Sequence, residues 1–361
     1  MPSKLTSFLA AIMFASYLLL FFTTTNTSSS AELLETAVAE EILRATQRLS
    51  VERNVAADPM IADNNSNRSL VIIMGSLRGG EQTWKTLYEN VLDPNSADLA
   101  LIVGKPTKDD QYVNSTLYAR SKYSWFFPEY DDWADAVDLI NGPGWRETHL
   151  PKMKRLRRTG LFGGFQGYTG SGIIIFMIRW FLSRHLQESD VLQKYDTFVI
   201  TRADHYYLCP HQFADLDISN GTVWTPEGES YGGVTDRHVV VSKKDILQIL
   251  DVLPSFLSKP FEDTIPDGKR GSNTNPERML KRAWIRNGLK LKTFPRVMAT
   301  CATKTDTTRW RVAAKRKNNK VEGEPTLFKK YRKEWVLSKE VCARRGEMVE
   351  RNETKISTEV S

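Results

Sequence analysis

The feature that most constrains the fold is an apolar run followed by a glycine-rich loop, a helix and a second apolar run. Residues Leu70–Met74 read LVIIM, a continuous apolar stretch typical of a strand buried on both faces of a parallel sheet. The loop Gly75–Gly80 follows, and then come a predicted helix over Glu81–Leu92 and a second strand over Asp98–Val103. This order predicts an α/β domain with a Rossmann-like, mostly parallel central sheet flanked by helices.

Weaker patterns complete this domain. Residues Lys105–Phe127 show no regular periodicity, so we expect a long loop there. The run Ile173–Leu186 is too short to span a bilayer and contains Arg179, which predicts a helix buried in the domain. The other elements that we expect are helices over Asp131–Ile140 and Pro276–Asn287 and strands over Tyr195–Ile200, Thr222–Thr225 and Val239–Ser242.

The amino terminus carries a charge-free apolar run, Leu5–Phe22, which as a helix would be roughly 27 Å long. Lys4 precedes the run and acidic residues follow it, so residues 1–4 are predicted to stay cytoplasmic. The chain is therefore expected to be a single-pass type II protein of a secretory-pathway membrane, with its domain in the lumen. The alternative is a signal peptide that is cleaved near Ser29–Ala31.

Residues 23–69 are predicted to be a stem between the membrane segment and the domain. Ser29 and Glu32 are spaced as a capping box, and apolar residues then recur every three or four positions, which predicts an amphipathic helix over Ala31–Glu52. Its apolar stripe favours either a homodimer or packing on its own domain. A lumenal location also fits the six Asn-x-Ser/Thr sequons, at Asn26, Asn64, Asn67, Asn114, Asn220 and Asn352.

The net charge of +7 is concentrated near the carboxyl terminus. Residues 304–345 contain 14 Lys and Arg against 5 Asp and Glu, so the remainder of the chain is slightly acidic. These charges do not accompany aromatic readers on a folded face, and no nucleic-acid partner is expected. Residues 304–361 are interpreted as a solvated basic segment, or as one that contacts anionic lipid or an acidic glycan.

The three cysteines are too few for a disulfide framework. One bridge is possible in an oxidising lumen, and Cys301–Cys342 is the pairing that we expect. The cysteines show no spacing typical of a zinc site.

The first candidate site is the loop Gly75–Gly80. Small residues such as Gly75 and Ser76 allow backbone N–H groups to approach a phosphate, and Arg78 adds a cation with a forked set of donors. The alternative is a plain tight turn.

The second candidate site follows the predicted strand Tyr195–Ile200. A carboxylate at a strand end, here Asp204, can hold a divalent metal that bridges two phosphates. Arg202 is placed to bind a phosphate or to form a structural salt bridge with Asp204.

The third candidate site is the segment Glu227–His238, in which two glycines precede Asp236 and Arg237. Asp236 is a candidate general base for an acceptor hydroxyl. Glu277, just after the start of the last helix, is a second candidate base, although it can also serve only to complement the helix dipole.

Together, the stretches FVITRADHYY, VWTPEGESYGGVTDRH and NPERMLKRAWIRNGL resemble type II glycosyltransferase-like proteins of the nucleotide-diphospho-sugar transferase (GT-A) type. The resemblance covers roughly Leu70–Met298. It implies a GT-A-like domain over residues 70–303, a nucleotide-sugar donor, a glycan or glycoprotein acceptor, and a Golgi location. It also implies that Gly75, Ser76, Arg78, Arg202, Asp204 and Arg237 meet the donor, and that Asp236 lies on the acceptor side.

The same resemblance implies a divalent cofactor, Mn²⁺ or Mg²⁺, with Asp204 as its ligand. The acidic motif of this class is Asp-x-Asp, and in this chain Arg202 stands at its first position. Arg202 is therefore an alternative source of part of the metal's charge. A literal Asp-x-Asp occurs at Asp215–Asp217, but it does not directly follow a predicted buried strand.

Two other functions fit parts of the sequence. The stretch Met74–Gly80, followed by Thr83, resembles the phosphosulfate-binding loop of Golgi sulfotransferases. That reading leaves the clusters around Asp204 and Asp236 unexplained. A non-catalytic glycan-binding protein of the lumen is the other alternative, because such proteins retain enzyme folds.

Overall fold

The computed structural model describes residues 68–105, 114–265, 274–306 and 319–359, with side chains as far as residue 346. All of them belong to one compact unit, Asn65–Ser361. The predicted membrane segment 5–22 and all but the last two residues of the stem lie outside the described residues. Within the described part, no helix is both long and apolar enough to cross a membrane.

Seven strands of the described residues form the central sheet, in the order β3-β2-β1-β4-β7-β6-β8. β1, β2, β3 and β4 pair in parallel, and β6 and β8 also pair in parallel, whereas β7 is antiparallel to both of its neighbours. The strands are β1 Ser69–Met74, β2 Asp98–Gly104, β3 Tyr123–Phe127, β4 Thr197–Thr201, β6 Thr222–Pro226, β7 Val239–Ser242 and β8 Lys290–Phe294. The predicted Rossmann-like, largely parallel sheet is thus confirmed.

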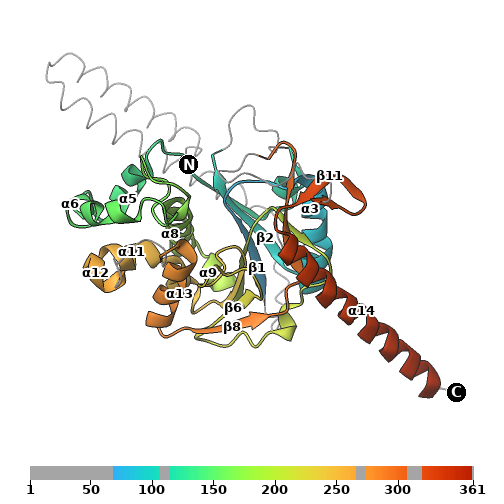
Figure 1. The fold of residues 1–361 in the computed structure, drawn as a ribbon. Coiled ribbons are helices and arrows are strands. Elements are labelled where there is room, and N and C mark those ends of the chain that lie inside the picture. Colours follow the sequence, from blue (N-terminus) through green and yellow to red (C-terminus); the bar gives the residue numbers. More distant parts are fainter. Residues whose placement is uncertain (1–67, 106–113, 266–273, 307–318, 360–361) are drawn as a thin grey trace, which may run out of the picture. The chain divides into compact units, whose positions relative to one another are not determined.

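Alternate side chains of each central strand enter two separate cores. Leu70 and Ile72 belong to one apolar cluster, and Val71 and Ile73 belong to the other. Helices α8, α11 and α13 lie on one side of β1 and β2, and α3 and α14 lie on the other (Figure 1). Burial on both faces explains why LVIIM is apolar at every position.

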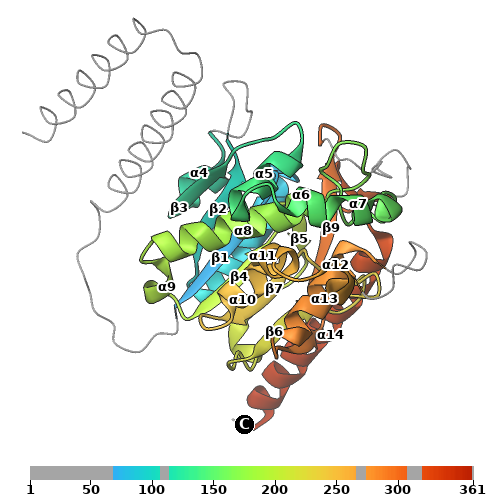
Figure 2. The same ribbon diagram turned by 90° about the vertical axis from the view of Figure 1, so that its left-hand side faces the viewer.

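The first face is covered by the helices of the middle of the chain, with α8 running across the sheet in front of β1 and β4 (Figure 2). These helices are α5 Trp133–Asn141, α6 Trp145–Thr148, α7 Leu150–Met153, α8 Gly172–Glu188, α9 Val191–Lys194, α10 Ile246–Leu250, α11 Val252–Leu257, α12 Phe261–Thr264 and α13 Pro276–Arg286. The second face is covered by α3 Gly80–Leu87, α4 Thr116–Arg120 and α14 Arg332–Glu359.

A second sheet of the described residues has the order β10-β11-β9-β5. Its strands are β5 His205–Tyr207, β9 Met298–Thr303, β10 Lys320–Val321 and β11 Glu324–Lys329. The expectation that residues 304–361 form a solvated segment does not hold for residues 320–329 and the first turns of α14, because these residues are integral to the fold. Trp335 and Val341 of α14 are buried, which anchors the helix on the domain.

Two local predictions need correction. The expected loop Lys105–Phe127 contains α4 and the edge strand β3, whose aromatic sequence YSWFF suits a half-buried strand. The expected helix Glu81–Leu92 begins one residue earlier and changes at Tyr88 into a π-helical turn that ends at Leu92.

The expected Cys301–Cys342 bridge is wrong, because Cys342 is bonded to Cys209. Cys301 is a buried free thiol inside β9, where it contacts the apolar cluster around Trp335. Cys342 lies two turns beyond Trp335 on α14, where it packs against the same core as Cys209. The helix thus carries Cys342 past β9 to the segment that follows β5.

Candidate functional site

The candidate site lies where the strand order of the central sheet reverses. β1 and β4 are neighbours, but the chain reaches β2 and β3 on one side of β1 before it returns to β4 on the other. In open α/β sheets, ligands bind outside the carboxyl ends of the strands at such a switch point. The loop Gly75–Gly80 follows β1 here, and Arg202 and Asp204 follow β4.

The antiparallel β7 brings the third predicted cluster to the same edge. Val239 at the start of β7 pairs with Ile200 near the end of β4, so Asp236 and Arg237 lie beside the residues that follow β4. The three clusters that the sequence singled out are therefore together in space. The literal Asp-x-Asp is elsewhere, since Asp217 is exposed and pairs with Lys292 of β8.

Arg202 and Asp204 form a two-pronged ion pair. Nε of Arg202 donates to Oδ1 of Asp204 at 2.7 Å, and Nη2 donates to Oδ2 at 2.6 Å. Burial alone would raise the pKa of Asp204, but the charge and hydrogen bonds of Arg202, with a further contribution from Lys330, hold that pKa well below its usual value. Asp204 is buried, whereas the side chain of Arg202 is 26% exposed and reaches the surface of the site.

The predicted metal ligation by Asp204 does not fit this arrangement. Both carboxylate oxygens already accept hydrogen bonds from a guanidinium, and Lys330 adds a second positive charge nearby. A divalent cation at Asp204 would have to displace Arg202 against this positive field. Among the described residues, no group of three or more His, Cys, Asp or Glu side chains is placed to hold a metal ion.

The second sheet places Lys330 beside this ion pair. The N–H of Cys301 in β9 donates to the carbonyl of Asp204, and the N–H of Lys330, just after β11, donates to the carbonyl of Thr300. Burial, followed by repulsion from Arg202, lowers the pKa of Lys330 to about 8. Repulsion from Arg202 thus acts on Lys330 in addition to burial, and the charge of Asp204 opposes both effects.

Arg78 approaches the same point from the end of β1. Burial, followed by repulsion from Arg202, lowers its pKa as well. The loop that carries it is held by Asp306, whose Oδ2 accepts hydrogen bonds from the N–H groups of Gly79 and Thr303. Gly75 adopts a left-handed conformation with φ of 103°, which turns the chain away from β1 into the loop. Arg78, Arg202 and Lys330 therefore form a cationic cluster at the switch point.

Arg237 is fixed in the site by a carboxylate that the sequence did not single out. Its Nη1 donates to Oε1 of Glu334 at 2.6 Å, and its guanidinium lies near the rings of Tyr231 and Tyr331. Burial works against the charge of Arg237, but Glu334 raises its pKa above the usual value. Glu334 is itself buried in the first turn of α14 and also accepts from the N–H and Oγ1 of Thr300.

Glu277 lies in the first turn of α13, next to the loop that leads to Asp236. Gly233 contacts the backbone of Glu277 so closely that a Cβ would lie 2.1 Å from its carbonyl carbon. Burial, followed by the negative charge of Asp236, raises the pKa of Glu277 to about 7. The backbone of Asp236 is fixed from the core, because Nη2 of the fully buried Arg179 donates to its carbonyl at 2.9 Å.

All eight predicted site residues thus come from the same edge of the sheet or from the helix end beside it. Sequence reasoning missed Lys330 and Glu334, because it counted them among the charges of a solvated segment. A signal was present: Trp335, Ser338, Val341 and Cys342 recur at helical spacing, and all but Cys342 are buried.

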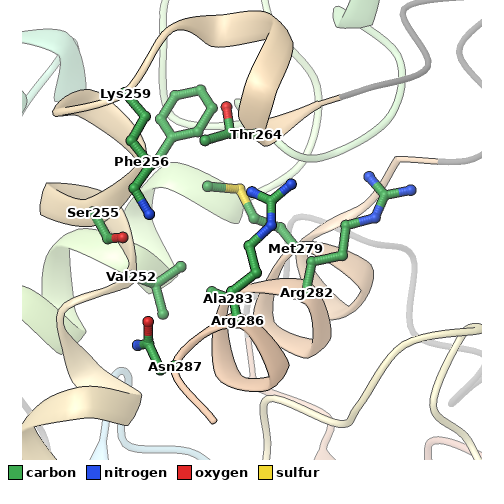
Figure 3. Close-up of a pocket in the computed structure, with 10 residues that line it drawn as sticks. All are labelled: Val252, Ser255, Phe256, Lys259, Thr264, Met279, Arg282, Ala283, Arg286 and Asn287. Carbon is green, nitrogen blue, oxygen red and sulfur yellow. The ribbon is translucent and has the colours of Figure 1, made fainter.

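Two hollows of the surface lie outside this cationic cluster. One, between α11–α12 and α13, has a volume of about 20 Å³, little more than a single water needs (Figure 3). The other is a groove of about 690 Å³ between the segment after β6 and the first turns of α14. Its lining includes Glu229, Arg296, Glu334 and Leu337, so it adjoins the carboxylate that holds Arg237.

The fold and its switch-point site define an α/β protein of the Rossmann-like type. No protein-family model matches the sequence, and no curated protein matches it. Among solved structures, the apo form of mouse xyloside xylosyltransferase 1 is similar to this chain, with a TM-score of 0.34 and 8% identity. That similarity covers 63% of this chain and 84% of the other. A likeness of this level assigns no residue and no activity.

Proposed function

We propose that the domain is a glycosyltransferase that moves a sugar from a nucleotide-sugar donor to a hydroxyl of a glycan or glycoprotein. One observation carries this proposal: a cationic cluster that suits a diphosphate lies at the switch point, and Asp236 interacts both with Arg202 of this cluster and with Glu277, whose pKa is raised to about 7. The resemblance of the sequence to GT-A-type proteins points to the same activity.

The proposed reaction uses these two parts at the same time. The acceptor oxygen forms a bond to the anomeric carbon of the sugar while the bond from that carbon to the diphosphate oxygen breaks. The electron pair of the broken bond stays on the diphosphate, where Arg78, Arg202 and Lys330 stabilise it. The acceptor proton passes to Glu277, because a carboxyl with a pKa near the working pH is a suitable general base.

Asp236 and Arg237 are assigned to positioning around this base. The charge of Asp236 raises the pKa of Glu277, and the charge of Arg237 opposes that effect. The groove of about 690 Å³ has a volume in the range of ligand sites and is the proposed room for the acceptor.

We further propose a lumenal location, in the Golgi or another secretory-pathway membrane, with anchoring through residues 5–22. Two described features support this. The Cys209–Cys342 disulfide is typical of an oxidising compartment, and Asn114 and Asn220 of the predicted sequons are exposed. The proposed homodimer through the stem concerns residues outside the described part.

The test is a donor screen on the full-length chain. Thermal unfolding is followed with UDP-sugars, GDP-sugars and the adenosine phosphosulfate donor, and release of the nucleoside diphosphate is then measured with mixed glycan acceptors. Stabilisation by one nucleotide-sugar, lost in Arg78→Ala, supports the proposal. Lys152→Ala is the matched control, because Lys152 is exposed and pairs with Glu262 away from the cluster.

Two results would contradict the proposal. A shift with the phosphosulfate donor alone would favour a sulfotransferase. A shift with glycan alone, without turnover of any donor, would favour a glycan-binding protein.

A further inference from the structure

The proposed reaction requires that groups at the switch point neutralise the charge that develops on the departing diphosphate. The bond to the sugar breaks with its electron pair on the diphosphate, so positive charge must lie at that position. Resting on the proposed function, we infer that Arg202 and Lys330, together with Arg78, take the place of a divalent metal ion, so that the nucleoside diphosphate is bound without one.

The geometry of Asp204 fixes the orientation of Arg202. Its two oxygens accept hydrogen bonds of 2.6 and 2.7 Å from one guanidinium, which orients the plane of Arg202 as well as neutralising the carboxylate. Asp204 is therefore a positioning residue for Arg202. Arg202 in turn keeps 26% of its side-chain surface exposed, so it retains surface from which to contact an anion at the mouth of the site.

The second sheet fixes the position of the backbone of Lys330. β5, β9 and β11 are neighbours in the second sheet, and their hydrogen bonds link the backbones of Asp204, Cys301, Thr300 and Lys330 in sequence. Lys330 is thus held at a fixed place relative to Asp204 by a sheet rather than by a long loop. A cation positioned before the reaction needs no reorganisation when charge develops.

The neighbouring carboxylates neutralise only part of the charge of Arg78, Arg202 and Lys330. Asp204 neutralises one of the three cations, and Asp306, which accepts hydrogen bonds from two backbone N–H groups, offsets part of the charge of Arg78, so the three cations keep a positive excess. Burial is the largest cause of the lowered pKa values of Arg78 and Lys330, and repulsion from Arg202 is the second, so each of these two cations lies in the field of a like charge. A diphosphate relieves this repulsion, whereas a divalent cation would increase it.

The experiment is isothermal titration calorimetry of UDP and of GDP with the full-length chain, once in EDTA and once in Mn²⁺. We expect the better of the two nucleotides to bind with dissociation constants that agree within about twofold in the two buffers. Binding that weakens tenfold or more in EDTA would overturn the inference while leaving the proposed function in place. Lack of binding in both buffers would contradict the proposed function and, with it, this inference.

Variants of Lys330 test whether this residue binds the nucleotide. Lys330→Met should weaken nucleotide binding about 10- to 100-fold in EDTA, in line with the loss of a hydrogen bond to a charged group, and Lys330→Arg should restore most of it. Lys339→Met is the control, because Lys339 is an exposed residue of α14 that pairs with Glu322. Equal binding by Lys330→Met and the control would remove Lys330 from the site.

Arg202→Asp provides the converse test, because it restores an Asp-x-Asp pattern at the end of β4. We expect this variant to bind the nucleotide poorly in EDTA and to recover binding in Mn²⁺. Binding of the variant in EDTA at the wild-type level would show that Arg202 does not stand in for a metal. Circular dichroism and thermal unfolding of each variant establish that the binding change is not a folding defect.

Discussion

At the scale of single residues, Glu277 makes the sharpest prediction. A base with a pKa of about 7 must lose its proton before it can accept one, so kcat/KM should rise with pH through about 7. Glu277→Gln should lower kcat by about 10²- to 10⁴-fold and remove this limb of the pH profile, with little change in donor binding. Glu322→Gln, at an exposed carboxylate near Lys339, should leave both unchanged. A pH limb that persists in Glu277→Gln would assign the base elsewhere.

Glu334 makes a prediction about stability at the same scale. Its carboxylate is buried between the guanidinium groups of Arg237 and Arg296, which are also buried. Glu334→Ala leaves both cations uncompensated and should lower the free energy of unfolding by about 3–5 kcal/mol, measured by urea denaturation. Glu340→Ala, an exposed change on the same helix, should cost less than about 0.5 kcal/mol. Equal effects of the two would show that Glu334 has no special role.

At the scale of elements, the disulfide between Cys209 and Cys342 ties α14 to the segment after β5. The two cysteines are 133 residues apart, so the bond removes much of the freedom of the unfolded chain. Cys342→Ser should lower the free energy of unfolding by about 2–5 kcal/mol. A reductant should destabilise the wild type by a similar amount and have no further effect on the variant. A reductant effect that persists in Cys342→Ser would contradict this assignment.

The sequence predicts the strands inside the central sheet and misses the edge strand β3 and the strands of the second sheet, including β9, which is buried along nearly its whole length. The runs at β1, β2 and β4 are apolar throughout, because they lie inside the central sheet. The edge strand β3 alternates weakly, and β5 and β10 have only three and two residues, so no periodicity can develop in them. The strands of the central sheet were therefore more predictable from the sequence than those of the second sheet.

The residues of the candidate site also differ in how well the sequence predicts their positions. Arg78, Arg202 and Asp236 follow or precede predictable strands, so the sequence could place them at one edge. Lys330 and Glu334 come from the far end of the chain and reach the site only through the second sheet and α14. Pairing between strands that are far apart in the sequence leaves no local pattern at Lys330, and the helical spacing of Trp335, Ser338 and Val341 is the local sign that the segment of Glu334 is folded.

At the scale of the whole molecule, three buried histidines predict sensitivity to acid. Burial lowers the pKa of His205 and His211 to about 3, and that of His238 lies well below its usual value. Their unfolded forms take up protons below about pH 6.5, whereas in the folded state His205 and His211 do not until about pH 3, and His238 does so only well below its usual range. The free energy of unfolding should thus fall as the pH drops from about 6.5 towards 3, with a limiting slope of about 4 kcal/mol per pH unit from the three rings.

The measurement is urea denaturation at a series of pH values. Carboxylates such as Asp204 add to the slope in the same direction, so the histidine contribution is read from a comparison of variants. His211→Gln should reduce the slope by about 1.4 kcal/mol per pH unit between pH 6 and 4. An unchanged slope would show that the ring of His211 is protonated equally in both states.

The link between Cys209 and Cys342 also sets an order of events during synthesis. A ribosome that adds about 5–20 residues per second synthesises Cys209 about 7–27 s before Cys342. Cys301 follows Cys209 by 92 residues and precedes Cys342 by 41, so in the last part of that interval the later thiol available to Cys209 is that of Cys301, whose final place is inside β9. The pairing of β5 with β9 places Cys301 in the interior, so early formation of this pair would leave Cys342 as the reactive partner of Cys209.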